Sequence, residues 1–194
     1  MTLTVKLLVV MFSLSTLVGC TDNPKAPFVD VNDLVTRIDD ARDMAEGADA
    51  DTQYRLGLRY ELAKPADFRE VVYWYRLAGA QHHPGALYRL CVLSDRGQGL
   101  TQDYHEALRW CRHAADQGHA RAMLTVATYY DKARAVSRDK VQAHRWFNLA
   151  AAYGEPEGRR GRDRIAGEMT QAQIAEAQLL ARNWRTLHQE TLEE

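Results

Sequence analysis

The sequence predicts an all-α fold, a right-handed α-solenoid of three helix–loop–helix repeats with capping helices at both ends. The main observation is a period of 36 residues at which one tryptophan, one aspartate and one alanine recur: Trp74, Trp110 and Trp146; Asp67, Asp103 and Asp139; Ala78, Ala114 and Ala150. A fixed period of about 20–50 residues is typical of arrays in which each repeat is one supersecondary unit. Helix-forming residues are abundant and there are only five prolines, which favours helices over strands.

Length and charge set the outer limits. The 194 residues allow one domain, or two at most, with a sizeable core. Hydrophobic residues make up 46% of the chain and charged residues 26%, as in an ordinary globular protein. The formal net charge of −1 offers no electrostatic footprint for nucleic acid, so we expect no nucleic-acid partner.

Residues 1–19 are predicted to be a lipoprotein signal peptide. Lys6 lies in a short charged segment, and residues 7–18 are apolar except for two serines and a threonine. This run is too short for a comfortable membrane span and has the length of a signal-peptide core. It is therefore not expected to belong to the fold.

The signal segment ends in Leu17-Val18-Gly19-Cys20, which resembles the bacterial lipobox. The resemblance implies cleavage before Cys20, lipidation of its sulfur and anchoring to a membrane through apolar chains. Thr21 follows in place of the aspartate that tends to retain such lipoproteins in the inner membrane, which points to the outer membrane, facing the periplasm. An ordinary secretory signal with an incidental cysteine is the alternative. Residues 20–31 contain two prolines and few apolar residues, and are predicted to be a tether.

A capping helix is expected at each end of the array. Residues 32–47 can form the first, with Asn32 as N-cap, Gly47 as stop, and an apolar stripe of Leu34, Ile38, Ala41 and Ala45. Residues 156–194 are expected to hold the C-terminal capping helices, the last of which begins after Thr170 as N-cap. Its apolar stripe is Ile174, Ala177, Leu180, Ala181 and Trp184. Terminal repeats of a solenoid need one polar face, which both segments offer.

Three repeats fill residues 48–155, at about 48–83, 84–119 and 120–155. The first helix of each, the A helix, carries a large apolar residue followed by a small one: Leu56-Gly57, Leu90-Cys91 and Val126-Ala127. The small residue allows close approach of the second, antiparallel helix, the B helix. On each B helix the tryptophan and the alanine four residues later share a face, so the ring can wedge between successive hairpins.

These spaced residues resemble the Sel1-like repeat family, a branch of the tetratricopeptide superfamily with a longer loop between its helices. The second copy matches the family pattern best, at Gly97, Gly99, Leu100, Asp103, Ala107, Trp110, Ala114, Ala115 and Gly118. The third copy has Ala133 and Ala135 in place of both loop glycines, and the first is two residues shorter between Tyr60 and Trp74. The resemblance implies an α-solenoid whose A helices line a concave, peptide-binding side.

Three arginines on the A helices are candidate partner-binding residues, namely Arg55, Arg59 and Arg89. Ordinary surface arginines are the alternative. A second basic run, at residues 159–164, is interleaved with acidic residues and reads as a solvated face of the cap.

Two cysteines remain after Cys20. Cys91 lies on an A helix and Cys111 on the B helix of the same hairpin, at similar distances from the connecting loop. Antiparallel packing would bring them to comparable heights, and a bridge needs Cα atoms no more than about 7 Å apart. A disulfide and a pair of buried free thiols both remain open.

No catalytic residue, metal ligand set or cofactor motif is predicted. The seven histidines include no pair at ligand spacing on one helix face, and those in the turns (His82, His83, His113 and His119) read as solvated. The chain also lacks a nucleophile elbow and a phosphate-cradling glycine loop.

The sequence thus indicates a non-enzymatic, membrane-tethered adaptor that binds a periplasmic protein or peptide. One alternative is a scaffold for envelope polymer export or for assembly of cell-wall enzymes. Another is a hydrolase of cell-wall or β-lactam substrates, an activity sometimes ascribed to cysteine-rich members of the family. Those members carry a cysteine pair in nearly every repeat, whereas this chain has one such pair.

Overall fold

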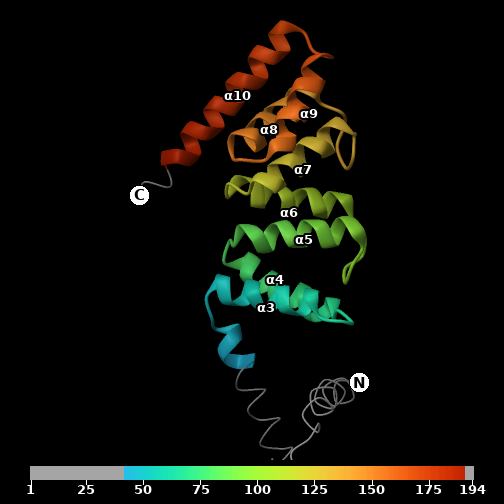
Figure 1. The fold of residues 1–194 in the computed structure, drawn as a ribbon, viewed down its shortest axis with the longest axis vertical. Coiled ribbons are helices and arrows are strands. Elements are labelled where there is room, and N and C mark those ends of the chain that lie inside the picture. The colour runs from blue at the N-terminus through green and yellow to red at the C-terminus, as the bar shows by residue number, and fades with distance from the viewer. Residues whose placement is uncertain (1–41, 191–194) are drawn as a thin grey trace, which may run out of the picture. The chain divides into compact units, whose positions relative to one another are not determined.

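The computed structural model describes residues 42–190, and this part of the chain is helical with no strand. A helical turn at residues 42–46 precedes eight α-helices: α3 (Ala50–Leu62), α4 (Phe68–Ala80), α5 (Pro84–Arg96), α6 (Tyr104–Asp116), α7 (Ala120–Asp131), α8 (Lys140–Ala152), α9 (Pro156–Ala166) and α10 (Gln171–Glu190) (Figure 1). The all-helical fold is confirmed. The predicted signal peptide, lipidation site and tether, and residues 32–41 of the first capping helix, lie outside the described residues.

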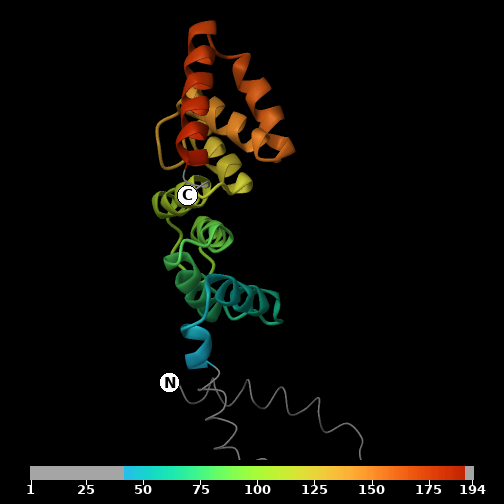
Figure 2. The same cartoon turned by 90° about the vertical axis from the view of Figure 1, so that its left-hand side faces the viewer.

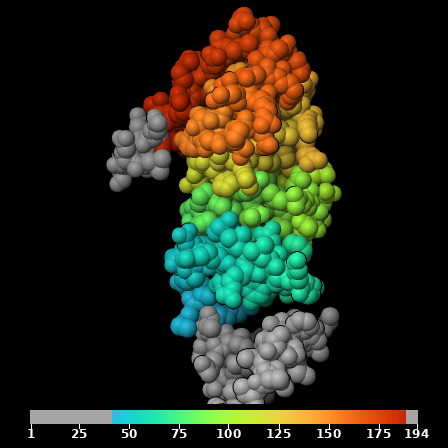
Figure 3. Space-filling model, viewed as in Figure 1, coloured from blue at the N-terminus to red at the C-terminus, as the bar shows by residue number. Residues whose placement is uncertain are grey.

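Residues 42–190 belong to one compact unit, in which the helices pair as hairpins. α3, α5 and α7 are the A helices, and α4, α6 and α8 are the B helices. From α3 to α9 each helix packs against the next along the chain, and α10 packs against α8. Figure 3 shows the result as successive bands of colour from α3 to α9, with α10 in red beside the orange part. This nearest-neighbour packing is the defining property of a solenoid.

Aspartates recur at 36-residue intervals because they begin the B helices. Asp67, Asp103 and Asp139 are the N-caps of α4, α6 and α8, and each carboxylate accepts a hydrogen bond from a backbone N–H of the first turn. Such a cap satisfies donors that would otherwise lack a partner at the start of a helix. The period in the sequence therefore marks helix starts as well as core positions.

The A helices have N-caps at equivalent positions, and two of these are histidines. Asp49 caps α3, while His83 Nδ1 accepts from the N–H of Ala86 at 3.1 Å and His119 Nδ1 from the N–H of Ala122 at 3.2 Å. Each ring also stacks on a tyrosine of the preceding A helix, Tyr54 for His83 and Tyr88 for His119. The interpretation of these two turn histidines as merely solvated is wrong.

The His119 cap gives the fold a pH dependence. Burial lowers the pKa of His119, and nearby Arg121 lowers it further. The folded pKa therefore lies below the unfolded value of about 6.5. The stability that neutral His119 contributes is complete above about pH 6.5 and is lost as the pH falls from there through the folded pKa. We expect His119→Asn, which keeps a capping oxygen but does not titrate, to lose less thermal stability than the wild type between about pH 7.5 and pH 5. Equal losses in melting experiments on both proteins would contradict this role.

The loop of the third repeat keeps its backbone path although its glycines are replaced. Gly97 and Gly99 in the second repeat have φ of 67° and 71°, and the equivalent Ala133 and Ala135 have φ of 54° and 60°. Alanine in this left-handed region costs about 1–2 kcal/mol relative to the right-handed region. The stacking of the neighbouring helices thus holds an unfavourable backbone in place.

Restoring the glycines is therefore expected to stabilise the protein. Ala133→Gly and Ala135→Gly should each raise the free energy of unfolding by about 0.5–1 kcal/mol, because the gain in the folded backbone exceeds the entropy that glycine adds to the unfolded chain. The same exchange on the exposed face of α10, Ala175→Gly, should lower it by about 1 kcal/mol. Urea denaturation of the three variants measures the change in the free energy of unfolding. If all three substitutions lowered it, the backbone at Ala133 and Ala135 would not be strained.

Both ends of the stack are closed by specific contacts. At the first end Arg42 binds Glu70 at 3.0 Å and lies over the rings of Tyr73 and Trp74. Buried Gln53 donates to the carbonyl of Glu46 at 2.8 Å, which ties the helical turn to α3.

At the other end, Thr170 begins α10 as the sequence predicts. Its N–H donates to Gln173 Oε1 at 2.9 Å, and the N–H of Gln173 donates back to Thr170 Oγ1 at 3.3 Å, which forms a reciprocal capping box. Ala177, Ala181 and Trp184 of α10 are buried, and Trp184 Nε1 donates to Asp116 of α6 at 3.3 Å.

Candidate functional site

A groove opens between the A helices of the second and third repeats. It has a volume of about 260 Å³ and is lined by α5, α7 and the residues directly after α7. Val92 and Leu124 give it an apolar wall, Thr125 and Thr128 line the α7 side, and the rim is charged. We call this the α5–α7 groove. A concave site with apolar walls and a few polar groups is what a protein needs to hold a side chain of a ligand.

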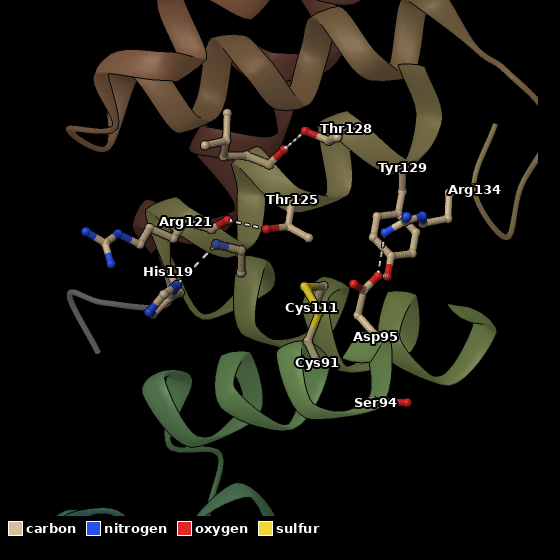
Figure 4. Close-up of a disulfide and its surroundings, with 12 residues drawn as sticks. Cys91, Ser94, Asp95, Cys111, His119, Arg121, Thr125, Thr128, Tyr129 and Arg134 are labelled. Atoms are coloured by element: carbon tan, nitrogen blue, oxygen red, sulfur yellow. Dashed lines mark hydrogen bonds and ion pairs between the residues drawn. A yellow bond between two sulfur atoms is a disulfide. The ribbon is translucent and has the colours of Figure 1, made fainter. Parts of the chain in front are cut away.

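One acidic residue organises the end of this groove. Asp95 accepts a hydrogen bond from the hydroxyl of Tyr129 and an ion-paired one from Arg134 at 2.8 Å (Figure 4). Burial and the bond to Asp95 raise the pKa of Tyr129, so the tyrosine stays protonated and donates. Arg134 also lies over the ring of Tyr104 at 4.6 Å, which fixes its direction. The groove end is therefore rigid before any partner arrives.

Equivalent acids occur in all three repeats and join each repeat to the next. Glu61 accepts from Arg89 of α5 at 3.5 Å, Asp95 from Tyr129 of α7, and Asp131 from Arg164 of α9 at 2.5 Å. Each acid lies near the end of its A helix and reaches the A helix that follows, or α9. The sequence has an acidic residue at the same place in every A helix. These contacts between repeats could have been predicted from that pattern, but they were not predicted.

Two cations on the rim have no ion-pair partner within residues 42–190. Arg96 and Lys132 end equivalent A helices or follow them directly, both are exposed, and within residues 42–190 neither has an ion-pair partner. With Asp95 matched by Arg134, the rim carries two positive charges in excess. An acidic group on a ligand would complement them.

A disulfide lies beneath the groove. Cys91 of α5 and Cys111 of α6 are joined with an S–S distance of 2.06 Å and a Cα–Cα distance of 5.2 Å, and both are completely buried (Figure 4). Cys91 lines the groove from below. The bridge thus fixes the A helix that forms one wall to its B helix.

The repeat explains why these two cysteines meet. The equivalent pair in the first repeat is Gly57 and Tyr75, where a Cβ added to Gly57 would lie 2.4 Å from the tyrosine ring. The small residue of the A helix therefore faces the residue that follows the tryptophan on the B helix. In the second repeat this contact is covalent.

The three predicted partner-binding arginines lie on another part of the A-helix face. Arg89 is half-buried and pairs with Glu61, so it joins α3 to α5. Arg55 is exposed and its Nε donates to the carbonyl of Asp51 at 3.3 Å, and Arg59 is exposed one turn further along α3. None of the three lines the α5–α7 groove.

The basic run of α9 is largely engaged within the cap. Arg164 binds Asp131 and Arg162 binds the adjacent Asp163 at 2.8 Å, whereas Arg159 and Arg160 are exposed.

Within residues 42–190 no three His, Cys, Asp or Glu side chains lie together in a way that could hold a metal ion. His82 and His113 do meet across a turn, ring nitrogen to ring nitrogen at 3.1 Å. In the same part of the chain, no helix is both long and apolar enough to cross a membrane.

The fold and its groove define a helical repeat protein of the α-solenoid class. In a comparison with known families, the Sel1 repeat matches residues 50–83, 84–119 and 120–154, more than half of the chain. The chain belongs to the Sel1 repeat family, which shows the fold and indicates a scaffold for protein–protein interaction. A search of curated protein sequences found no match.

Solved structures that are similar to this chain include the following two. One is c5321, described as a protective antigen present in uropathogenic Escherichia coli strains that displays an SLR fold; it is 31% identical over 72% of this chain, with a TM-score of 0.67. This chain spans only 30% of the length of that protein. The other is a Sel1 repeat protein from Oxalobacter formigenes, 26% identical over 66% of this chain and 97% of its own, with a TM-score of 0.59.

Proposed function

We propose that the protein is a non-enzymatic adaptor of the cell envelope that holds a protein or peptide in the α5–α7 groove. The observation that supports this most is the combination in one place of an apolar wall, a rigid Asp95–Tyr129–Arg134 cluster and two unpaired cations. A rigid groove binds with a small loss of entropy, so neither a cofactor nor an energy source is needed. Membership of the Sel1 repeat family is consistent with this role.

The chemistry of the groove suggests the kind of segment it would hold. Val92 and Leu124 would contact an apolar side chain, and Arg96 and Lys132 would pair with an acidic residue beside it. Specificity of this kind comes from the charges, while the apolar contact contributes affinity. The partner would therefore present an acidic residue next to an apolar one.

Charge reversal of two pairs of cations tests which part of the A-helix face binds the partner. Arg96→Glu with Lys132→Glu should abolish recovery of the partner after crosslinking in the native envelope, because the rim would then repel an acidic segment. Arg55→Glu with Arg59→Glu is the matched pair on α3, where the sequence alone places the contact. Loss of recovery with the α3 pair and not with the groove pair would move the site to Arg55 and Arg59.

Attachment to the membrane is part of the proposal and rests on the lipobox-like segment that ends at Cys20. Lipidation there would place the repeats at the periplasmic face of the outer membrane, with residues 20–31 as tether. Cys20→Ala should abolish incorporation of labelled palmitate and release the protein from the membrane fraction. A wild-type protein that carries no label and fractionates as soluble would exclude the anchor.

Catalysis on cell-wall or β-lactam substrates is the rival hypothesis from another class. Turnover assays with the purified protein on peptidoglycan fragments and on a chromogenic β-lactam separate it from the adaptor. The adaptor proposal predicts no turnover above that of a heat-denatured control. Turnover that depends on a groove residue would replace the proposal.

A further inference from the structure

The C-terminal cap contains a second cleft, which is lined by α8, α9 and α10 and shares no residue with the α5–α7 groove. α9 and α10 both pack against α8 and hardly against each other, so they diverge from the turn that joins them (Figures 1 and 2). The space between them has a volume of about 460 Å³, with α8 as its floor. A smaller hollow of about 110 Å³ continues it between α8 and α10. We call the larger space the cap cleft.

Arginines dominate the walls of the cap cleft. Arg182 and Arg185 of α10 line it, with Arg162 of α9 opposite, and both α10 arginines also line the smaller hollow. The only acid among the lining residues is Asp163, and it pairs with Arg162 at 2.8 Å. Within residues 42–190 neither Arg182 nor Arg185 has an ion-pair partner. Two arginines without an ion-pair partner therefore line one small space, and their charges favour the entry of an anion.

The floor of the cleft holds an unpartnered polar atom. His144 of α8 is 2% exposed, and its Nδ1 has no hydrogen-bond partner among the described residues. A buried polar atom without a partner is unfavourable, and a hydrogen bond to a bound ligand would satisfy it. The amides of Asn148 and Gln178 line the same space and can donate further hydrogen bonds.

From this juxtaposition we infer that the cap cleft binds a small molecule bearing a carboxylate or phosphate group, held by Arg182 and Arg185. The planar guanidinium binds both kinds of oxyanion through two parallel hydrogen bonds, so the shared chemistry is an oxyanion. The size of the cleft suits a single small molecule and excludes a duplex or a folded domain. This inference is independent of the adaptor proposal, because it involves none of the groove residues.

Isothermal titration of the purified full chain at low salt tests the inference, with inorganic phosphate and citrate as the two oxyanion probes and glycerol as the neutral control. We expect saturable 1:1 binding of at least one oxyanion and none of glycerol. Binding of phosphate alone indicates a phosphate-bearing ligand, and binding of citrate alone a carboxylate-bearing one.

Matched variants decide whether the cleft is the site. Arg182→Gln and Arg185→Gln should each weaken binding about tenfold or more, which corresponds to the loss of a charge-assisted hydrogen bond. Arg159→Gln and Arg160→Gln, exposed arginines of α9 outside the cleft, should leave the affinity unchanged. All four side chains are exposed, so the variants are expected to fold, which circular dichroism verifies. Absence of saturable binding, or equal weakening by all four substitutions, would overturn the inference.

Discussion

Replacing Trp146 by alanine should lower the free energy of unfolding by about 3–5 kcal/mol. The ring is 5% exposed and lies in the larger core cluster, 6.1 Å from the ring of Trp184 in an edge-to-face arrangement. Truncation removes the buried ring and leaves a cavity between α8 and α10, and both effects destabilise the fold. Because those helices close the end of the stack, the damage should extend to the packing of α10. Chemical denaturation followed by circular dichroism measures the cost.

Trp110 supplies a matched control from the same repeat position. It is half-buried between the two core clusters, and its Nε1 donates to Glu106 at 3.4 Å. Less apolar area leaves water when this ring packs, so Trp110→Ala should cost clearly less than Trp146→Ala. A cost at Trp110 equal to or greater than that at Trp146 would contradict the burial that the structure describes.

Loss of the disulfide should have the next largest effect, about 3 kcal/mol. The bridge between Cys91 and Cys111 closes a loop with a sequence separation of 20, which restricts the unfolded chain. The double variant Cys91→Ala/Cys111→Ala removes this constraint while small apolar groups remain at both buried positions. Urea denaturation under oxidising conditions should show the variant to be less stable by that amount.

A reductant distinguishes the bridge from ordinary packing. Reduction should lower the stability of the wild type close to that of the double variant and leave the variant unchanged. Thiol titration in denaturant without reductant should find neither Cys91 nor Cys111 reactive in the wild type. Two reactive groups beyond Cys20, or equal stability of both proteins under oxidising conditions, would exclude the disulfide.

The helices could be predicted from the sequence because their signals are local or periodic. Asp103 and Trp110 recur in register with the other repeats, and Thr170 with Gln173 carries the pattern of a capping box. Ala133 and Ala135 follow the path of the glycines they replace, because the surrounding helices determine the backbone there. A period in the sequence thus fixes the position of each hairpin even where the loop residues differ.

The candidate sites were less accessible to prediction, since they depend on contacts between repeats. Arg89 and Arg134 look alike as surface arginines in the sequence, yet one pairs with Glu61 between α3 and α5 and the other with Asp95 beside the groove. The cap cleft arises from the divergence of α9 and α10, and no local pattern records that angle. Arg182 and Arg185, which line this cleft, lie beside the apolar stripe of α10. The stripe predicts only that α10 packs against the core.

Site-specific photo-crosslinking can show whether the α5–α7 groove holds a partner. A crosslinking residue at Thr125, which lines the groove, is compared in the native envelope with one at Arg159 of α9. We expect a discrete crosslinked species from position 125 that disappears when Arg96→Glu and Lys132→Glu are added, and none from position 159. A species from position 125 that survives both charge reversals, or crosslinking from position 159 alone, would show that the groove and its two cations do not hold the partner.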